Sequence, residues 1–169
     1  MKNLLKYTSK LKHLPRTGWL KHNIDMPETV AAHSWQMAMM ALKLAQNGEN
    51  YNFDKVIKLC LCHDMGESVI GDLTPADKNY ADKKQLEAQA VSQIAEDSSF
   101  KALKSLFEEY EANETPEANL ANDLDKLDMY AQSLDYEAKY PGKDLSEFRI
   151  SATKAIKTDI GRRILETLK

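Results

Sequence analysis

VIKLCLCHD, residues 56–64, places a histidine and an acid directly after an apolar run. Leu59 and Cys60 precede His63 by four and three residues, the spacing of one face of an α-helix. The apolar residues indicate a helix that packs into a core, and His63 shares their face. A neutral imidazole beside the Asp64 carboxylate is a poor choice for closing a hydrophobic core, but it suits a divalent cation. The segment therefore predicts a buried helix that carries part of a metal site.

Helical periodicity continues on both sides of this segment. Glycine and proline are few, six and five in 169 residues, and they punctuate segments whose apolar residues recur with helical rather than alternating spacing. The pattern predicts an all-α fold, a single-domain helical bundle over residues 1–169, with polar loops near 14–26 and 66–77. Helices are expected, to within a few residues at each end, over 3–13, 27–47, 54–63, 80–96, 100–112, 115–139, 145–157 and from 159 onward.

Composition and charge exclude several classes of protein. A hydrophobic content of 43% in 169 residues fills one core without implying a membrane span. The formal net charge of −3 provides no basic field for duplex nucleic acid. Lysines interrupt the apolar residues of the N-terminus, unlike a secretory signal, and Cys60 and Cys62 diverge by about 200° on a helix and should stay reduced. We therefore expect a cytoplasmic protein.

Two further residues complete a candidate ligand set. His33 falls on the apolar face of the helix expected after Pro27, and Asp125 lies in the 115–139 helix. Taken singly, His33 fits a core histidine and Asp125 a surface acid. Together with His63 and Asp64 they offer two imidazoles and two carboxylates, which suit Mn, Fe, Co or Zn better than the all-oxygen shells of Ca. We expect one divalent ion in the bundle core, with two open positions if it is octahedral, for a water and a substrate oxygen.

Four strings of this sequence resemble the HD-domain metallophosphohydrolases, and most closely their small single-domain 5′-deoxynucleotidase branch. The strings are PETVAAHS at 27–34, HDMGE at 63–67, GDLTP at 71–75 and LDK at 124–126, so the resemblance covers most of the chain. Many HD proteins share the four ligands. The strings HDMGE and GDLTP are more specific, and they indicate the small 5′-deoxynucleotidase branch. The resemblance implies removal of phosphate from deoxyribonucleoside 5′-monophosphates, with a metal held by His33, His63, Asp64 and Asp125.

Glu67 and Asp72 match further functional acids of that family. Hydrolysis of a phosphate monoester needs charge neutralisation, an activated water and a protonated leaving group. Glu67 lies about one helical turn beyond His63 and Asp64, on the metal side of the helix, where it would orient or deprotonate the attacking water. The alternative for Glu67 is an exposed acid at a helix end. Asp72 fits either catalysis and substrate binding or a structural turn.

Three residues are candidates for binding the substrate. Trp19 matches a family tryptophan that lines the sugar pocket and disfavours a ribose 2′-hydroxyl, although a core plug is the other interpretation. Relatives place an arginine directly before that tryptophan, where this chain has Gly18, so Arg16 is the candidate phosphate clamp. Lys78, just after GDLTP, is a second candidate for the phosphate, or an ordinary solvated lysine.

Other functions stay open at this point. Another HD reaction would hydrolyse a cyclic nucleotide, a guanosine polyphosphate or a nucleoside triphosphate, but extra phosphates need extra basic residues, and the segments quoted above offer few. A catalytically silent metal-binding module is the other alternative, against which the retention of Glu67 and Asp72 argues. The base preference, the choice among Mn, Co, Fe and Zn, and the oligomeric state, a homodimer included, are left open by the sequence. We expect a small-molecule nucleotide as the substrate.

Overall fold

The structure, a computed structural model, describes residues 1–169 and is built from helices without a strand. The expected all-α class is confirmed. An isolated bridge between Pro15 and Thr29 is the only pairing of extended backbone. The α-helices are α1 (Lys2–Leu11), α2 (Thr17–Lys21), α3 (Val30–Leu44), α4 (Phe53–Cys62), α5 (Glu67–Ile70), α6 (Lys83–Ser98), α7 (Ala102–Ala112), α8 (Pro116–Lys139), α9 (Ser146–Ala155) and α10 (Asp159–Leu168), and the short 3₁₀ helices are η1 (Ala45–Asn47) and η2 (Tyr80–Asp82).

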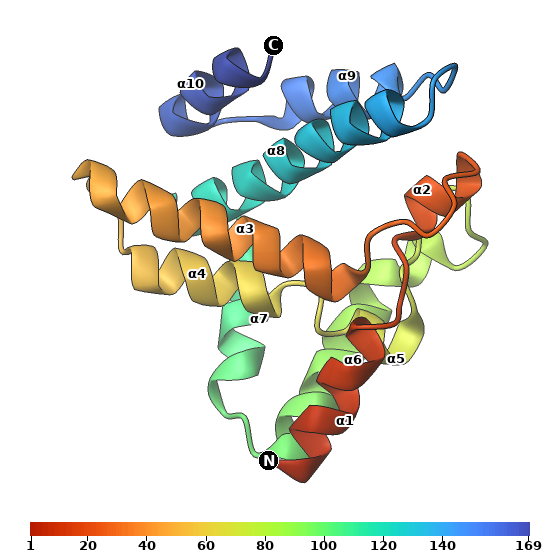
Figure 1. Ribbon diagram of the computed structural model, residues 1–169. Helices are drawn as coiled ribbons and strands as arrows, with labels where there is room; N and C mark the ends of the chain where they lie inside the picture. Colours follow the sequence, from red (N-terminus) through yellow and green to blue (C-terminus); the bar gives the residue numbers. More distant parts are fainter.

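The helices form two groups that meet in the middle of the molecule. α3 and α4 lie antiparallel, α8 packs against both of them, and α9 and α10 cover α8 (Figure 1). At the opposite end α1, α5 and α6 pack together, and α7 leads from α6 to α8 (Figure 1). The chain starts at the end formed by α1 and α6 and finishes at the other, beyond α10. Residues of α3, α4 and α8 that are far apart in sequence are therefore neighbours.

Two apolar clusters account for most of the core. The larger cluster joins α3, α4 and α8, and the smaller one joins α1, α6 and α7. Burying one large aliphatic side chain stabilises the fold by about 1.5–3 kcal/mol, so these clusters hold the helices in place. Val30 and Cys62 belong to the smaller cluster, whereas Met37 and Cys60 belong to the larger. His33 and His63 thus lie where α3 and α4 pass from one cluster to the other.

Side-chain caps explain where the central helices begin. Thr29 Oγ1 accepts a hydrogen bond of 3.2 Å from Ala32 N, so α3 starts at Val30 rather than at Pro27 as expected. Thr115 caps α8 in the same way, and α8 begins at Pro116 as predicted.

Two short helices were not predicted from the sequence. α2 and α5 lie inside the segments expected to be loops. Each is only about one turn long, which is too short for apolar residues to show helical spacing. Their presence matters because α2 carries Trp19 and α5 carries Glu67.

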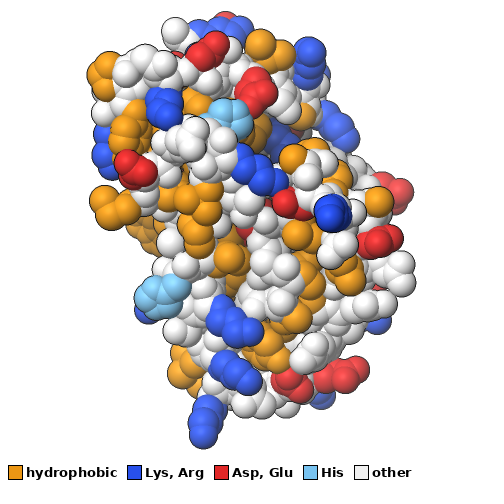
Figure 2. All heavy atoms as spheres, turned by 90° about the vertical axis from the view of Figure 1, so that its right-hand side faces the viewer, with side chains coloured by type: hydrophobic (Ala, Val, Ile, Leu, Met, Phe, Trp, Pro, Cys, Tyr) orange, Lys and Arg blue, Asp and Glu red, His pale blue; other side chains and the backbone are white.

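The surface carries charges of both signs. On the face shown in Figure 2, acidic and basic side chains both occur in the upper half, whereas in the lower half basic side chains lie mainly at the left and acidic ones at the right. The formal net charge of the chain is −3. None of the helices combines the length and the apolar character that crossing a membrane requires.

Candidate metal centre

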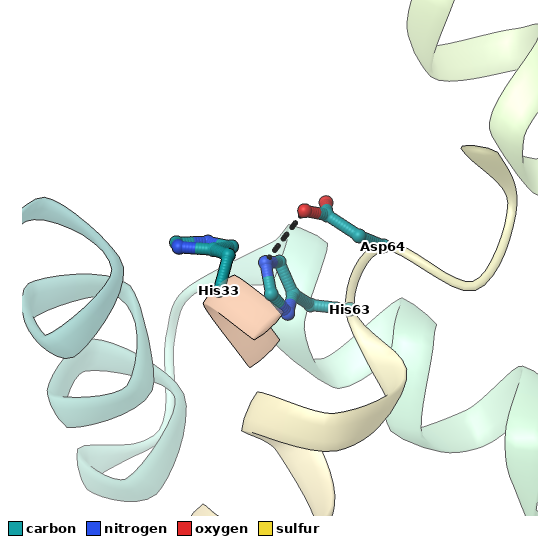
Figure 3. Close-up of side chains that lie close together, drawn as sticks. All are labelled: His33, His63 and Asp64. Carbon is teal, nitrogen blue, oxygen red and sulfur yellow. Dashed lines mark ion pairs between the residues drawn. The ribbon is translucent and has the colours of Figure 1, made fainter. Parts of the chain in front are cut away.

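Two histidines and one acid face each other at the centre of the molecule. His33 is the fourth residue of α3 and is fully buried, and His63 lies at the C-cap of α4 and is 5% exposed. Figure 3 shows the His63 ring beside the Asp64 carboxylate, with Nε2 and Oδ2 3.0 Å apart, and the His33 ring nearby. One ligand atom from each of the three residues lies within 4.8 Å of the other two. Such a cluster can be bridged by one ion.

The hydrogen bonds of the two rings settle which nitrogen is available. His63 Nδ1 lies 2.9 Å from the carbonyl oxygen of Cys60, and His33 Nδ1 lies 2.6 Å from Asp128 Oδ2. A carbonyl oxygen only accepts, so His63 Nδ1 donates, and a neutral ring then presents a lone pair at Nε2. His33 Nε2 is buried without a hydrogen-bond partner. Histidine ligands of metals are commonly oriented in this way, with the second nitrogen donating to a carboxylate or a carbonyl.

Asp125 brings the fourth predicted ligand to the same place. It lies on α8, and its Oδ1 is 3.2 Å from His33 Nε2. Although burial raises the pKa of Asp125, Lys126 at 2.8 Å and then His33 outweigh it and hold this pKa well below its usual range. Burial also raises the pKa of Asp64, but His63 and Arg16 lower it overall. The structure therefore brings together all four predicted ligands, with both carboxyl groups ionised.

The field at His33 favours positive charge. Burial and Arg16 lower the pKa of His33, but the contacts with Asp125 and Asp128 outweigh them and raise it to about 9. The acids that stabilise a proton here would stabilise a divalent cation for the same reason. Two imidazoles and two carboxylates fit a first-row transition metal, and His33 Nε2, which makes no hydrogen bond, is available to bind it.

A cavity of about 350 Å³ opens next to these residues. Its wall is made by α2, the residues after α4, α5, the segment 72–75, η2, α6, α7, α8 and α9. The wall includes three of the ligand candidates and most of the other residues singled out by the sequence, namely His63, Asp64, Asp125, Arg16, Trp19, Glu67 and Asp72.

Glu67 is the most unusual group in this wall. It is 1% exposed, and both carboxylate oxygens are buried without a hydrogen-bond partner. Burial, followed by the charges of Asp64 and Asp72, raises its pKa to about 10. The alternative of an exposed helix-end acid is therefore wrong, and Glu67 is a buried acid that faces the cavity.

Asp72 links the cavity to α2. Its Oδ2 accepts a hydrogen bond of 2.5 Å from Thr17 N, the first residue of α2. This contact fixes the helix that carries Trp19, and Asp72 also lines the cavity. A role in positioning α2 and a role toward a ligand are compatible for this residue.

The three substrate-binding candidates differ in position. Arg16 lines the cavity and its NH1 lies 3.0 Å from Asp64 Oδ2. Trp19 is 3% exposed and packs against Phe148, with ring centroids 4.3 Å apart, yet it also lines the cavity. The core and pocket interpretations of Trp19 thus both hold. Lys78 is exposed and is not among the residues of the wall.

Sequence reasoning missed several residues of the site. Asp128, which orients His33, follows Asp125 by three residues on the same face of α8, so its spacing carried the signal. Lys83 and Glu87 line the cavity from α6, and no local pattern marks them. Only the packing of α6 against α5 brings them there.

Comparisons with known proteins agree with this geometry. A family model described as an HD domain matches residues 8–169. The 5′-deoxynucleotidase hdd1 of Schizosaccharomyces pombe is 40% identical over an alignment that covers 83% of this chain and 74% of the relative. The 5′-deoxynucleotidase HDDC2 of Dictyostelium discoideum is 41% identical, with 78% and 75% covered. A solved structure, a conserved hypothetical protein from Pyrococcus furiosus, superposes with a TM-score of 0.85 at 34% identity and covers 99% of this chain and 96% of its own.

Removing one imidazole or one carboxylate should abolish metal binding. After loading with manganese and gel filtration, we expect about one metal per chain for the parent and none for His63→Ala or Asp64→Ala, measured by elemental analysis. His13→Ala, at an exposed position outside the site, is the control and should bind metal like the parent. Retention of stoichiometric metal by both site variants would contradict the assignment, provided that circular dichroism shows them folded.

Proposed function

This chain belongs to the HD-domain family, and on that premise we propose that it is a metal-dependent 5′-deoxynucleotidase. It converts deoxyribonucleoside 5′-monophosphates to deoxyribonucleosides and phosphate. The observation that carries the proposal is the cavity of about 350 Å³, whose wall combines candidate metal ligands, a buried carboxyl group that accepts no hydrogen bond, and an arginine. The relatives named 5′-deoxynucleotidase, 40% and 41% identical to this chain, support the same reaction.

The metal would be held by His33, His63, Asp64 and Asp125. When bound, a divalent ion supplies positive charge that neutralises the phosphate and lowers the pKa of water. The mixed set of imidazoles and carboxylates supports Mn, Co, Fe or Zn as the ion.

Arg16 binds the phosphate in this proposal. Its guanidinium is held by Asp64 at the edge of the cavity, and burial, although it lowers the pKa of an arginine, is outweighed here by Asp64 and Asp72, which raise it. The group is therefore always charged. Charged hydrogen bonds from a guanidinium to phosphate oxygens are short and strong, so Arg16 orients the monoester.

Glu67 accepts the proton of the attacking water. Its oxygens accept no hydrogen bond from the protein, and Glu67 lines the cavity, so a water can occupy their hydrogen-bonding sites. Arg16 and Lys83 lower the pKa of Glu67 against the effect of burial. A divalent ion held by the four ligands would also lower the pKa of Glu67 and so favour the carboxylate form that a base requires.

Trp19 selects the sugar. Its Nε1 donates a 2.9 Å hydrogen bond to Glu28 Oε1, and the ring packs against Phe148 and Tyr136. A ring held by these contacts and by the hydrogen bond to Glu28 would exclude the additional 2′-hydroxyl of a ribonucleotide.

Three further properties complete the proposal. We propose that residues 1–169 form one HD domain in the cytoplasm, which the two free, buried cysteines support.

We also propose a homodimer, supported by an exposed apolar stripe on α3 formed by Trp35, Met39 and Leu42. The substrate is a small nucleotide rather than duplex nucleic acid, in line with the net charge of −3.

A phosphate-release screen of the metal-loaded protein tests the function. We expect deoxyribonucleoside monophosphates to be hydrolysed with the highest kcat/KM, ahead of ribonucleoside monophosphates, because the site combines one phosphate clamp with a crowded sugar pocket. The panel should include a cyclic nucleotide, a nucleoside triphosphate and a guanosine polyphosphate. Preference for one of these would favour another HD reaction, and no release from any substrate by metal-loaded protein would favour a silent module.

Replacing Glu67 should separate catalysis from metal binding. We expect Glu67→Gln to keep its metal and to lose about 10²- to 10⁴-fold in kcat, because the amide cannot take a proton. Glu114→Gln, at an exposed position after α7, is the matched control and should behave like the parent. Turnover of thymidine monophosphate near the parent rate in Glu67→Gln would show that another group is the base.

Replacing Trp19 should weaken the discrimination between sugars. Trp19→Ala opens the wall of the cavity, so we expect the deoxy-over-ribo ratio of kcat/KM to fall by about tenfold or more while the metal stays bound. Trp35→Ala removes a tryptophan that is 61% exposed on α3 and should leave the ratio unchanged. Equal proportional losses on both sugars in Trp19→Ala would identify it as a packing residue only.

A further inference from the structure

The first residue of α6 brings a cation to the inner wall of the cavity. Lys83 Nζ lies 3.6 Å from Glu67 Oε1 and 3.4 Å from Glu87 Oε1, and its side chain is 25% exposed. Lys83 and Glu87 are one turn apart on the same face of α6, which suits an ion pair within a helix. All three side chains line the cavity.

Backbone packing fixes this arrangement. A Cβ atom placed on Gly66 would lie 3.2 Å from the carbonyl oxygen and 3.3 Å from the Cα of Glu87, which is closer than ordinary contact. Glycine at this position therefore allows α6 to approach the residue next to Glu67. The distance between Lys83 and Glu67 is set by two backbones in contact, and not by flexible side chains alone.

Glu67 makes no hydrogen bond through its carboxyl group, so a neighbouring cation is its main polar contact. Both of its oxygens are buried and accept no hydrogen bond. A buried carboxylate without compensation is costly, and removal of its partner charge is strongly destabilising. The other nearby cation, Arg16, pairs with Asp64 at 3.0 Å. Lys83 is the only cation that forms an ion pair with Glu67.

We propose that Lys83 is a positioning residue for the hydrolysis: held by Glu87 at 3.4 Å, it contacts Glu67 Oε1 at 3.6 Å and keeps the Glu67 carboxyl group in place at the wall of the cavity. The proposal rests on the proposed function, in which Glu67 takes the proton from water. Lys83 keeps its own proton throughout and makes no contact with the phosphate, because its ammonium group is shared between two acids.

Stability measurements test the pairing without reference to activity. The full chain is compared as parent, Lys83→Met, Glu67→Gln and the double variant by urea unfolding. We expect Lys83→Met to lower the urea midpoint, and this loss to shrink by about half when Glu67→Gln is also present, because the contact with Glu67 is then already lost while Glu87 loses its partner in both backgrounds. Lys84→Met, whose side chain is 76% exposed, should show additive effects with Glu67→Gln. Additive losses for Lys83→Met would overturn the pairing.

Kinetics then test what the pairing does. For a deoxyribonucleoside monophosphate we expect Lys83→Met to lose about tenfold or more in kcat with KM changed by less than about threefold, and Lys83→Arg to recover most of kcat. A raised KM with unchanged kcat would overturn the proposal and identify Lys83 as a phosphate clamp. Parent protein that releases no phosphate would contradict the proposed function, and the stability comparison would still decide whether Lys83 compensates Glu67.

Discussion

The contact between His33 Nδ1 and Asp128 Oδ2, at 2.6 Å and fully buried, is the interaction on which the site depends. It ties α3 to α8 across an apolar core, where a misplaced charge would cost several kcal/mol. It also turns His33 so that Nε2 faces Asp125, and the Cys60 carbonyl orients His63 in the same sense. Removing Asp128 would leave a buried imidazole free to rotate, and the cluster would lose its geometry.

Short elements around this centre supply the remaining chemistry. α2 and α5 are too short to be stable alone, and polar contacts hold them in place. Asp72 accepts a hydrogen bond from the backbone N–H of Thr17, the first residue of α2. This contact places Arg16 and Trp19 in the wall of the cavity. Gly66 lets α6 approach α5, which places a lysine against the buried Glu67. Rigid long helices thus carry the ligands, and short helices carry the groups that act on the substrate.

The sequence predicts those parts of the molecule that follow from local spacing. The start of α8 at Pro116 after Thr115, and the inward faces of His33 and His63, come from caps and helical periodicity. Contacts between elements could not be foreseen in this way. Lys78 was a predicted phosphate-binding residue because it closely follows GDLTP, yet it is exposed and does not line the cavity. Lys83 was not predicted, and the packing of α6 brings it to the cavity.

We propose that one metal is bound by two imidazoles through Nε2 and by two carboxylates. Anomalous diffraction from crystals of the cobalt-loaded chain tests it most directly. We expect one peak per chain, with Nε2 of both His33 and His63 and an oxygen of both Asp64 and Asp125 within bonding distance, about 2.0–2.2 Å. A peak bound through Nδ1 of His33, or one that lies away from these four side chains, would contradict it.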